Sequence, residues 1–120
     1  MDRRIFHIKE KLSQNPELSW TVEKMADTVG LSVPGFKQTF KKKVGVSPLA
    51  YLLELRVEKA RQLLSDPHNF LQINEIGVIC GLTNASHFTR DFKKRNGMTP
   101  NEYRDHCAEI EQSKLQNGQE

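Results

Sequence analysis

The apolar positions of this chain recur at the spacing of α-helices rather than of strands. The clearest run falls at i, i+3, i+4 and i+7 and predicts one buried helix face: Val22, Met25, Ala26 and Val29. Thr21 is a suitable N-cap for this helix, and Gly30 is a suitable signal for its end. No segment shows the alternation of a strand, so the fold class is predicted to be all-α with about seven helices.

A second helix is predicted directly after the first, with two phenylalanines on one side. Ser32 can cap it, and Pro34 lies in its first turn, where a missing N–H costs little. Phe36 and Phe40 are four residues apart and therefore point to the same side. Gly45 ends the helix.

Three further helices and a tail are predicted. The longest helix is expected over 48–65, with an apolar stripe made by Leu49, Leu52, Leu53, Val57, Ala60, Leu63 and Leu64. An opening helix precedes residue 15, and a short helix is expected over 101–106. Residues 111–120 are expected to form a polar, frayed tail.

The chain contains an internal duplication. The segment from Phe36 to Pro48 recurs 52 residues later, from Phe88 to Pro100, with both phenylalanines, the basic triplet, the glycine and the Ser/Thr-Pro pair in register. Before that segment, the matching residues of the two copies are 51 positions apart instead of 52. The one extra residue follows a Gly-Leu pair, where a turn can accommodate it. Each unit is therefore predicted to be two short helices around a tight turn.

Composition indicates a globular protein. The 120 residues are 37% hydrophobic, which excludes a disordered chain. No apolar run approaches the roughly 18 residues of a membrane helix, so no membrane association is expected. The N-terminus does not resemble a signal peptide, and the only cysteines are Cys80 and Cys107; we expect reduced thiols, no metal site and a cytoplasmic location.

The net charge of +3 is unevenly distributed. Residues 34–44 carry +4 and residues 86–97 carry +3, whereas residues 101–120 carry −3. The two positive segments are the second helices of the two repeated units. This placement changes the picture, because a helix-turn-helix with a basic second helix is typical of proteins that read the DNA major groove.

Two other classes of function stay open on the residues alone. A helical protein-interaction module could dock an acidic partner on the same basic faces. An enzyme is the weakest alternative, since the sequence shows no nucleophile–base set, phosphate loop or metal spacing. We therefore expect no catalytic residues and no cofactor.

Residues 81–104 resemble the second helix-turn-helix signature of the AraC/XylS transcription regulators, and residues 56–64 resemble the linker helix of that family. The resemblance covers roughly residues 5–106. It implies a bacterial DNA-binding domain over 1–110, with a first helix-turn-helix at 21–44, a linker helix at 48–65 and a second helix-turn-helix at 72–96. It also implies sequence-specific binding to double-stranded DNA, with recognition helices in successive major-groove segments.

The resemblance also implies site residues and partners. Base-facing positions are Pro34, Lys37, Gln38, Lys41, Ala85, Ser86, Thr89 and Arg90, and phosphate-facing positions are Ser32, Lys42, Lys43, Lys93, Lys94 and Arg95. The expected partners besides DNA are RNA polymerase and an effector-sensing or dimerisation domain that 120 residues do not contain.

Several of these roles have structural alternatives. Arg90 could instead form an ion pair with Asp91 or with a neighbouring helix. Lys37 and Gln38 could belong to a solvated face, and His87 could cap or pack rather than read a base. The chain also departs from the family at Gly77, where alanine is usual. Glycine there is expected to weaken its helix by about 0.5–1 kcal/mol relative to alanine.

Overall fold

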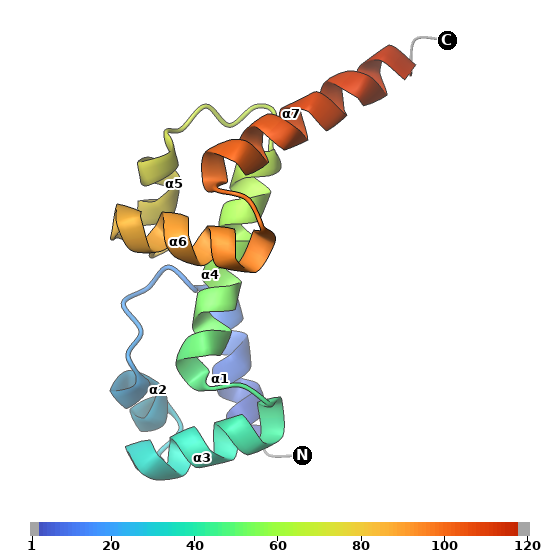
Figure 1. The fold of residues 1–120 in the computed structure, drawn as a ribbon. Helices are drawn as coiled ribbons and strands as arrows, with labels where there is room; N and C mark the ends of the chain where they lie inside the picture. Colours follow the sequence, from blue (N-terminus) through green and yellow to red (C-terminus); the bar gives the residue numbers. More distant parts are fainter. Residues whose placement is uncertain (1–2, 118–120) are drawn as a thin grey trace. The chain divides into compact units, whose positions relative to one another are not determined.

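The computed structural model describes residues 3–117, with side chains through 115. This part of the chain is all-α, as predicted, and contains seven helices (Figure 1). They are α1 (Arg3–Gln14), α2 (Val22–Thr28), α3 (Val33–Val44), α4 (Pro48–Ser65), α5 (Ile73–Ile79), α6 (Ala85–Asn96) and α7 (Pro100–Asn117).

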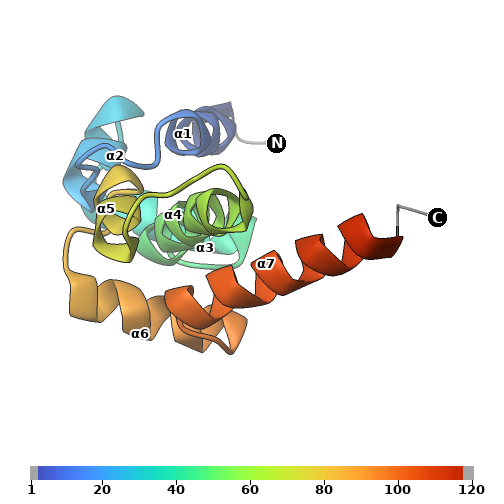
Figure 2. The same cartoon turned by 90° about the horizontal axis from the view of Figure 1, so that it is seen from above.

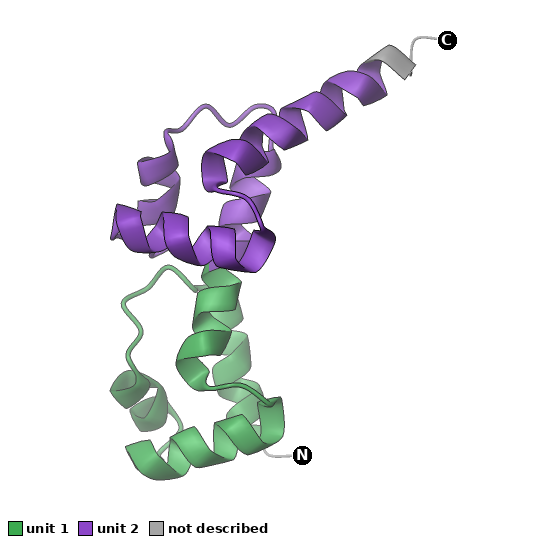
Figure 3. Ribbon diagram, in the orientation of Figure 1, with its two compact units in different colours: residues 1–56 green, residues 57–120 purple. Residues whose placement is uncertain are grey.

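The helices divide into two compact units whose boundary lies inside α4. Unit 1 comprises Met1–Arg56 and unit 2 comprises Val57–Glu120 (Figure 3). The first part of α4 therefore packs in unit 1 and the second part in unit 2. Each unit is described by itself below.

Unit 1 is built around the two phenylalanines of α3. Phe36 and Phe40 are fully buried, and their ring centroids lie 5.7 Å apart. The ring of Phe40 also meets that of Tyr51 on α4 at 5.5 Å, nearly edge to face. The other buried members of this core come from α1, α2 and α4: Ile5, Ile8, Leu12, Val22, Met25, Ala26 and Leu52.

Arg56 fastens α4 to the segment that precedes α2 within unit 1. Its Nε donates to the carbonyl oxygen of Pro16 at 2.7 Å, and a terminal nitrogen donates to that of Leu18 at 2.8 Å. Burial lowers the pKa of the Arg56 guanidinium, and the negative charge of Glu17 opposes that shift. Both carbonyl oxygens lie outside the helices, and each accepts a hydrogen bond from the charged guanidinium.

Unit 2 repeats the packing of unit 1. Phe88 and Phe92 of α6 are buried with ring centroids 6.0 Å apart, and Phe92 meets Tyr103 of α7 at 5.4 Å. Tyr103 stands 52 residues after Tyr51, so the duplication extends to the aromatic contact. Ile76, Cys80, Val57, Ala60 and Leu64 are also buried.

The turn between the paired helices is the same in both units. Gly30 and Gly81 adopt φ of 70° and 87°, the left-handed region that favours glycine. The following leucine amides donate back across the turn, from Leu31 to the carbonyl of Ala26 at 3.0 Å and from Leu82 to that of Gly77 at 2.7 Å. This is the Schellman arrangement, which satisfies the last carbonyls of α2 and α5.

Gly77 has a role that the sequence did not reveal. A Cβ built on it would lie 2.9 Å from the carbonyl oxygen of Leu82 and 2.9 Å from Cδ2 of Phe88. The expectation that alanine would serve α5 better is therefore wrong in this fold. Glycine is required because the turn and α6 approach α5 too closely for a methyl group.

The C-terminal helix is much longer than predicted. Instead of a short helix over 101–106, α7 continues through Asn117, so residues 111–117, which are polar except for Leu115, are helical rather than frayed. No glycine or proline interrupts residues 101–117, and the Glu, Gln, Lys and Leu residues there are good helix formers. The remaining tail residues, 118–120, lie outside the described part of the chain.

Candidate nucleic-acid interface

The first candidate recognition helix is α3, which is capped at both ends by side chain and backbone. The hydroxyl oxygen of Ser32 accepts from the amide of Gly35 at 3.2 Å. Gly45 follows the helix with φ of 94°, and its amide donates to the carbonyl of Lys41 at 2.8 Å. The caps fix where the helix begins and ends, and the burial of Phe36 and Phe40 shows which face it turns to the core.

The face of α3 away from the core is exposed. The four predicted base-facing residues follow i, i+3, i+4 and i+7, so they share one side of the helix, and all four are exposed: Pro34, Lys37, Gln38 and Lys41. Proline offers only apolar contact, whereas an amide and two ammonium groups can hydrogen-bond base edges or phosphates. The structure therefore brings these four predicted residues together on one solvent-facing surface.

The second candidate recognition helix, α6, has the same construction. The side-chain oxygen of Asn84 accepts from the amide of His87 at 3.0 Å, and Gly97 closes the helix with φ of 75°. All four predicted base-facing residues are exposed, and they line one side of α6: Ala85, Ser86, Thr89 and Arg90. Within the described part of the chain Arg90 makes no hydrogen bond or ion pair, so the predicted alternative of pairing with Asp91 is not what the fold adopts.

The remaining basic side chains gather in the last turn of each helix. Lys42 and Lys43 are exposed at the end of α3, and Lys93, Lys94 and Arg95 are exposed at the end of α6. Cations in a last turn also stabilise the helix through its dipole, by about 0.3–1 kcal/mol each. Ser32 differs from these five, because its hydroxyl oxygen already accepts the capping bond.

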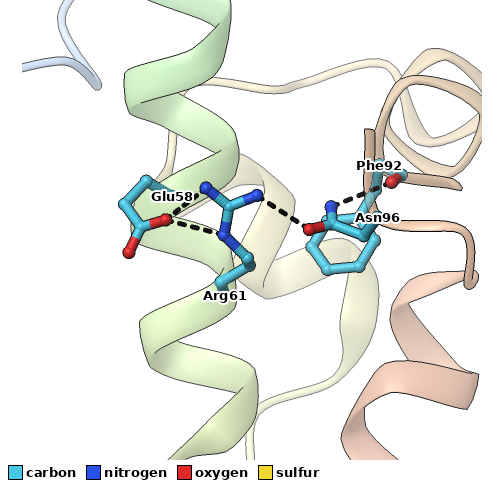
Figure 4. Close-up of polar contacts among 4 residues, drawn as sticks. All are labelled: Glu58, Arg61, Phe92 and Asn96. Atoms are coloured by element: carbon cyan, nitrogen blue, oxygen red, sulfur yellow. Dashed lines mark hydrogen bonds and ion pairs between the residues drawn. The ribbon is translucent and has the colours of Figure 1, made fainter. Parts of the chain in front are cut away.

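One contact that holds α6 was not foreseen. Arg61 of α4 donates to Oδ1 of Asn96 at 2.7 Å, and Nδ2 of Asn96 donates to the carbonyl of Phe92 at 2.9 Å (Figure 4). Glu58 holds the other side of the guanidinium, accepting from Nε at 2.6 Å and forming an ion pair with the second terminal nitrogen. The last turn of α6 is thereby attached to α4 within unit 2.

The sequence contained only half of the signal for this contact. Glu58 and Arg61 stand three residues apart, the spacing of a helical ion pair. The bond to Asn96 spans 35 residues and has no counterpart in unit 1, because the equivalent position there is Val44. A hydrogen bond between residues so far apart leaves no periodic pattern along the chain.

Over residues 3–117, no three His, Cys, Asp or Glu side chains lie close enough to hold a metal ion. None of the seven helices is long and apolar enough to cross a membrane. His87 is exposed, and only its backbone amide takes part in the cap of α6.

Comparison with known proteins places this geometry in a family. A family model described as a helix-turn-helix domain matches residues 25–106. The HTH-type transcriptional regulator MtrA of Neisseria gonorrhoeae is 29% identical over 103 residues, 86% of this chain. The xylose operon regulatory protein of Escherichia coli K12 is 38% identical over 89 residues, 74% of this chain.

Solved structures show the same similarity. The crystal structure of a Chromobacterium violaceum transcriptional regulator, described as containing an AraC-type DNA-binding domain, superposes with a TM-score of 0.78 at 30% identity. The match covers 88% of this chain and 93% of that one. By contrast, the chain spans only 34% of the length of MtrA and 22% of that of the xylose regulator.

Proposed function

Because the chain belongs to the AraC/XylS family of helix-turn-helix domains, we propose that it binds double-stranded DNA sequence-specifically and regulates bacterial transcription. One observation carries the proposal. Two helices, α3 and α6, each bury a phenylalanine pair and expose a polar face that ends in three consecutive basic residues. A helix of this kind after a tight turn fits the major groove and attracts phosphates at its end.

The proposed division of labour follows the chemistry of the exposed side chains. Gln38 pairs with adenine through its amide, and Lys37 or Arg90 reaches O6 and N7 of guanine. Ser86 and Thr89 donate to or accept from base edges, while Pro34 and Ala85 make apolar contacts. Lys41 completes the base-facing side of α3.

The phosphate contacts are assigned to the ends of the two helices. Lys42 and Lys43 serve α3, and Lys93, Lys94 and Arg95 serve α6, where their long stems can reach the backbone beside the groove. Ser32 keeps its cap and can still donate its hydroxyl proton to a phosphate oxygen. The two recognition helices are proposed to enter successive major-groove segments, about 34 Å apart along the duplex.

The domain boundaries and further partners are also proposals. We assign the DNA-binding domain to residues 1–110, without catalytic activity and in the cytoplasm. RNA polymerase is a proposed partner, and so is an effector-sensing or dimerisation domain, since the matched relatives are about three to five times longer than the matched region. The rival hypothesis, a module that docks an acidic protein on its basic faces, predicts binding indifferent to DNA.

The test is selection of bound duplexes from a random pool, followed by affinity measurements across a salt series. We expect one enriched sequence class and an affinity that falls steeply with salt, with a slope of about −5 if six phosphates are contacted. No enrichment, or equal affinity for random DNA at every salt concentration, would contradict the proposal.

A further inference from the structure

Unit 2 contains a groove that lies apart from the proposed recognition surface. It is lined by the end of α4, the following loop and one side of α7, and its volume is about 420 Å³. That volume is within the range of ordinary ligand sites. No residue of α6 lines it, and Figures 1 and 2 both show the second half of α7 running away from α5 and α6.

Part of the groove is apolar. Leu64, which is buried, lines it, and so do Phe70 and Leu115, with 88% and 62% of their surfaces exposed. A phenylalanine so exposed in the described chain makes almost no packing contact of its own. The groove therefore offers apolar side chains that an occupant can cover.

The charges around the groove are mostly negative. Asp66, Asp105 and Glu111 line it, and Arg104 is the only cation among its lining residues. This sign is opposite to that of α3 and α6, so the groove repels nucleic-acid phosphates and attracts basic side chains. The occupant is therefore not DNA.

Arg104 contributes its charge to the groove but no free donor. One of its terminal nitrogens is buried and has no hydrogen-bond acceptor in the described part of the chain. Because that nitrogen has no accessible surface, it cannot donate to an occupant of the groove. The apolar side chains and the carboxylates therefore decide what the groove can bind.

We propose that this groove binds a basic amphipathic helix supplied by a partner protein. The apolar face of that helix covers Phe70 and Leu115, and its lysines or arginines face the three carboxylates. One amphipathic segment meets both requirements, because its apolar and its basic side chains lie on opposite faces of the helix.

The test uses the full chain and a fluorescent designed peptide about 15 residues long, or roughly four helical turns. The peptide carries leucines on one face and lysines on the other; the control peptide has glutamates in place of the lysines. We expect saturable binding of the basic peptide, measured by anisotropy, and none of the acidic one. Phe70→Ser should weaken binding about tenfold or more, as expected for an aromatic anchor.

Two further variants and one control make the outcome decisive. Asp105→Asn with Glu111→Gln should weaken the basic peptide selectively, whereas Val78→Ser removes an exposed apolar side chain outside the groove and should change nothing. Phe70→Ser should leave DNA affinity unchanged, which keeps this test separate from that of the proposed DNA binding. Equal binding of both peptides would overturn the proposal, and so would binding that Phe70→Ser leaves unchanged. A concentration-dependent dimer that Phe70→Ser abolishes would also overturn it, in favour of a second copy of the chain as the occupant.

Discussion

The backbone amide of Leu82 donates to the carbonyl oxygen of Gly77 at 2.7 Å, closing the turn between α5 and α6. In unit 1 the equivalent bond joins Leu31 to Ala26 at 3.0 Å. The two turns have the same hydrogen bonds, but the tighter one leaves no space for a methyl group at its first residue. Glycine at 77 therefore follows from the close approach of the Leu82 carbonyl and the Phe88 ring.

Gly77→Ala should destabilise the domain despite raising helix propensity. Overpacking typically costs about 1–3 kcal/mol, and the propensity gain returns at most about 1 kcal/mol, so the free energy of unfolding should fall by about 1 kcal/mol. Urea unfolding followed by circular dichroism measures the change. Val78→Ala, at the exposed neighbouring position, is the matched control; a variant with alanine at 77 that is more stable than the parent would show that the turn has room.

Arg61→Ala should loosen the last turn of α6. The substitution leaves Oδ1 of Asn96 without its charged donor, and the free energy of unfolding should fall by about 1–2 kcal/mol. A double-mutant cycle with Asn96→Ala isolates the pair, and we expect a coupling of about 1 kcal/mol. Glu58→Gln is the milder control, because it keeps an acceptor for the guanidinium; a coupling energy near zero would mean that the bond contributes nothing in solution.

Glu102 should contribute acid-sensitive stability at the start of α7. Its carboxylate accepts from the amide of Thr99 at 2.9 Å, and the Thr99 hydroxyl oxygen accepts from the amide of Glu102 at 3.2 Å. The backbone bond from Thr99 is the main reason why the pKa of Glu102 is lowered, with a second hydrogen bond from Thr99 adding to it. Because the folded-state pKa lies below the ordinary value of 4.5, this stability is complete above that pH and is lost as the pH falls through the folded-state pKa.

Glu102→Gln tests this pH dependence. Glutamine can accept the same hydrogen bond from Thr99 but does not titrate. The free energy of unfolding should therefore fall less at acidic pH in the variant than in the parent. Urea midpoints measured between neutral and strongly acidic pH give the comparison. Parallel curves for the two proteins would show that the carboxylate plays no part.

Gln38→Ala should relax the preference for one base pair. If the amide reads adenine, the variant loses discrimination of about 1–3 kcal/mol at that position while it keeps its affinity for other sequences. Competition gel shifts with single-base operator variants measure this effect. An unchanged preference at every position would assign Gln38 to a solvated face.

Lys94→Ala should weaken binding to all duplexes alike. A phosphate contact carries no sequence information, so specificity should persist while the salt slope becomes shallower by about 1. Affinity for specific and random duplexes across a salt series gives both quantities. Lys59 of α4, outside both recognition helices, provides a matched lysine control; a loss confined to one sequence would contradict the phosphate role.

The helices and the faces they present could be predicted because their determinants are local. Ser32 caps α3, Gly45 ends it, and Phe36 and Phe40 mark the buried side through the helical period. Because α6 repeats the pattern of α3, the same determinants predict its ends and its buried side. All fourteen candidate DNA-contacting residues are exposed. Once the apolar side of a helix is known, its opposite side is known to face solvent.

The length of α7 shows where this local reasoning fails. Its second half has no sustained apolar stripe, and periodicity detects only helices that bury one face. Residues 111–117 are helical because they are good helix formers without an interrupting glycine or proline. A segment can therefore be helical without an apolar period, as residues 111–117 are.

The sequence by itself determined the all-α class, the duplicated pair of short helices and the basic side of each second helix. Caps, helical periods and charge runs act over three to seven residues, so they can be recognised in the sequence itself. Only the tertiary structure decided that Gly77 must be glycine, that Arg61 holds Asn96, and that Phe70 and Leu115 border one groove. Each of these depends on the distance between helices, which is set by how side chains far apart in sequence pack together.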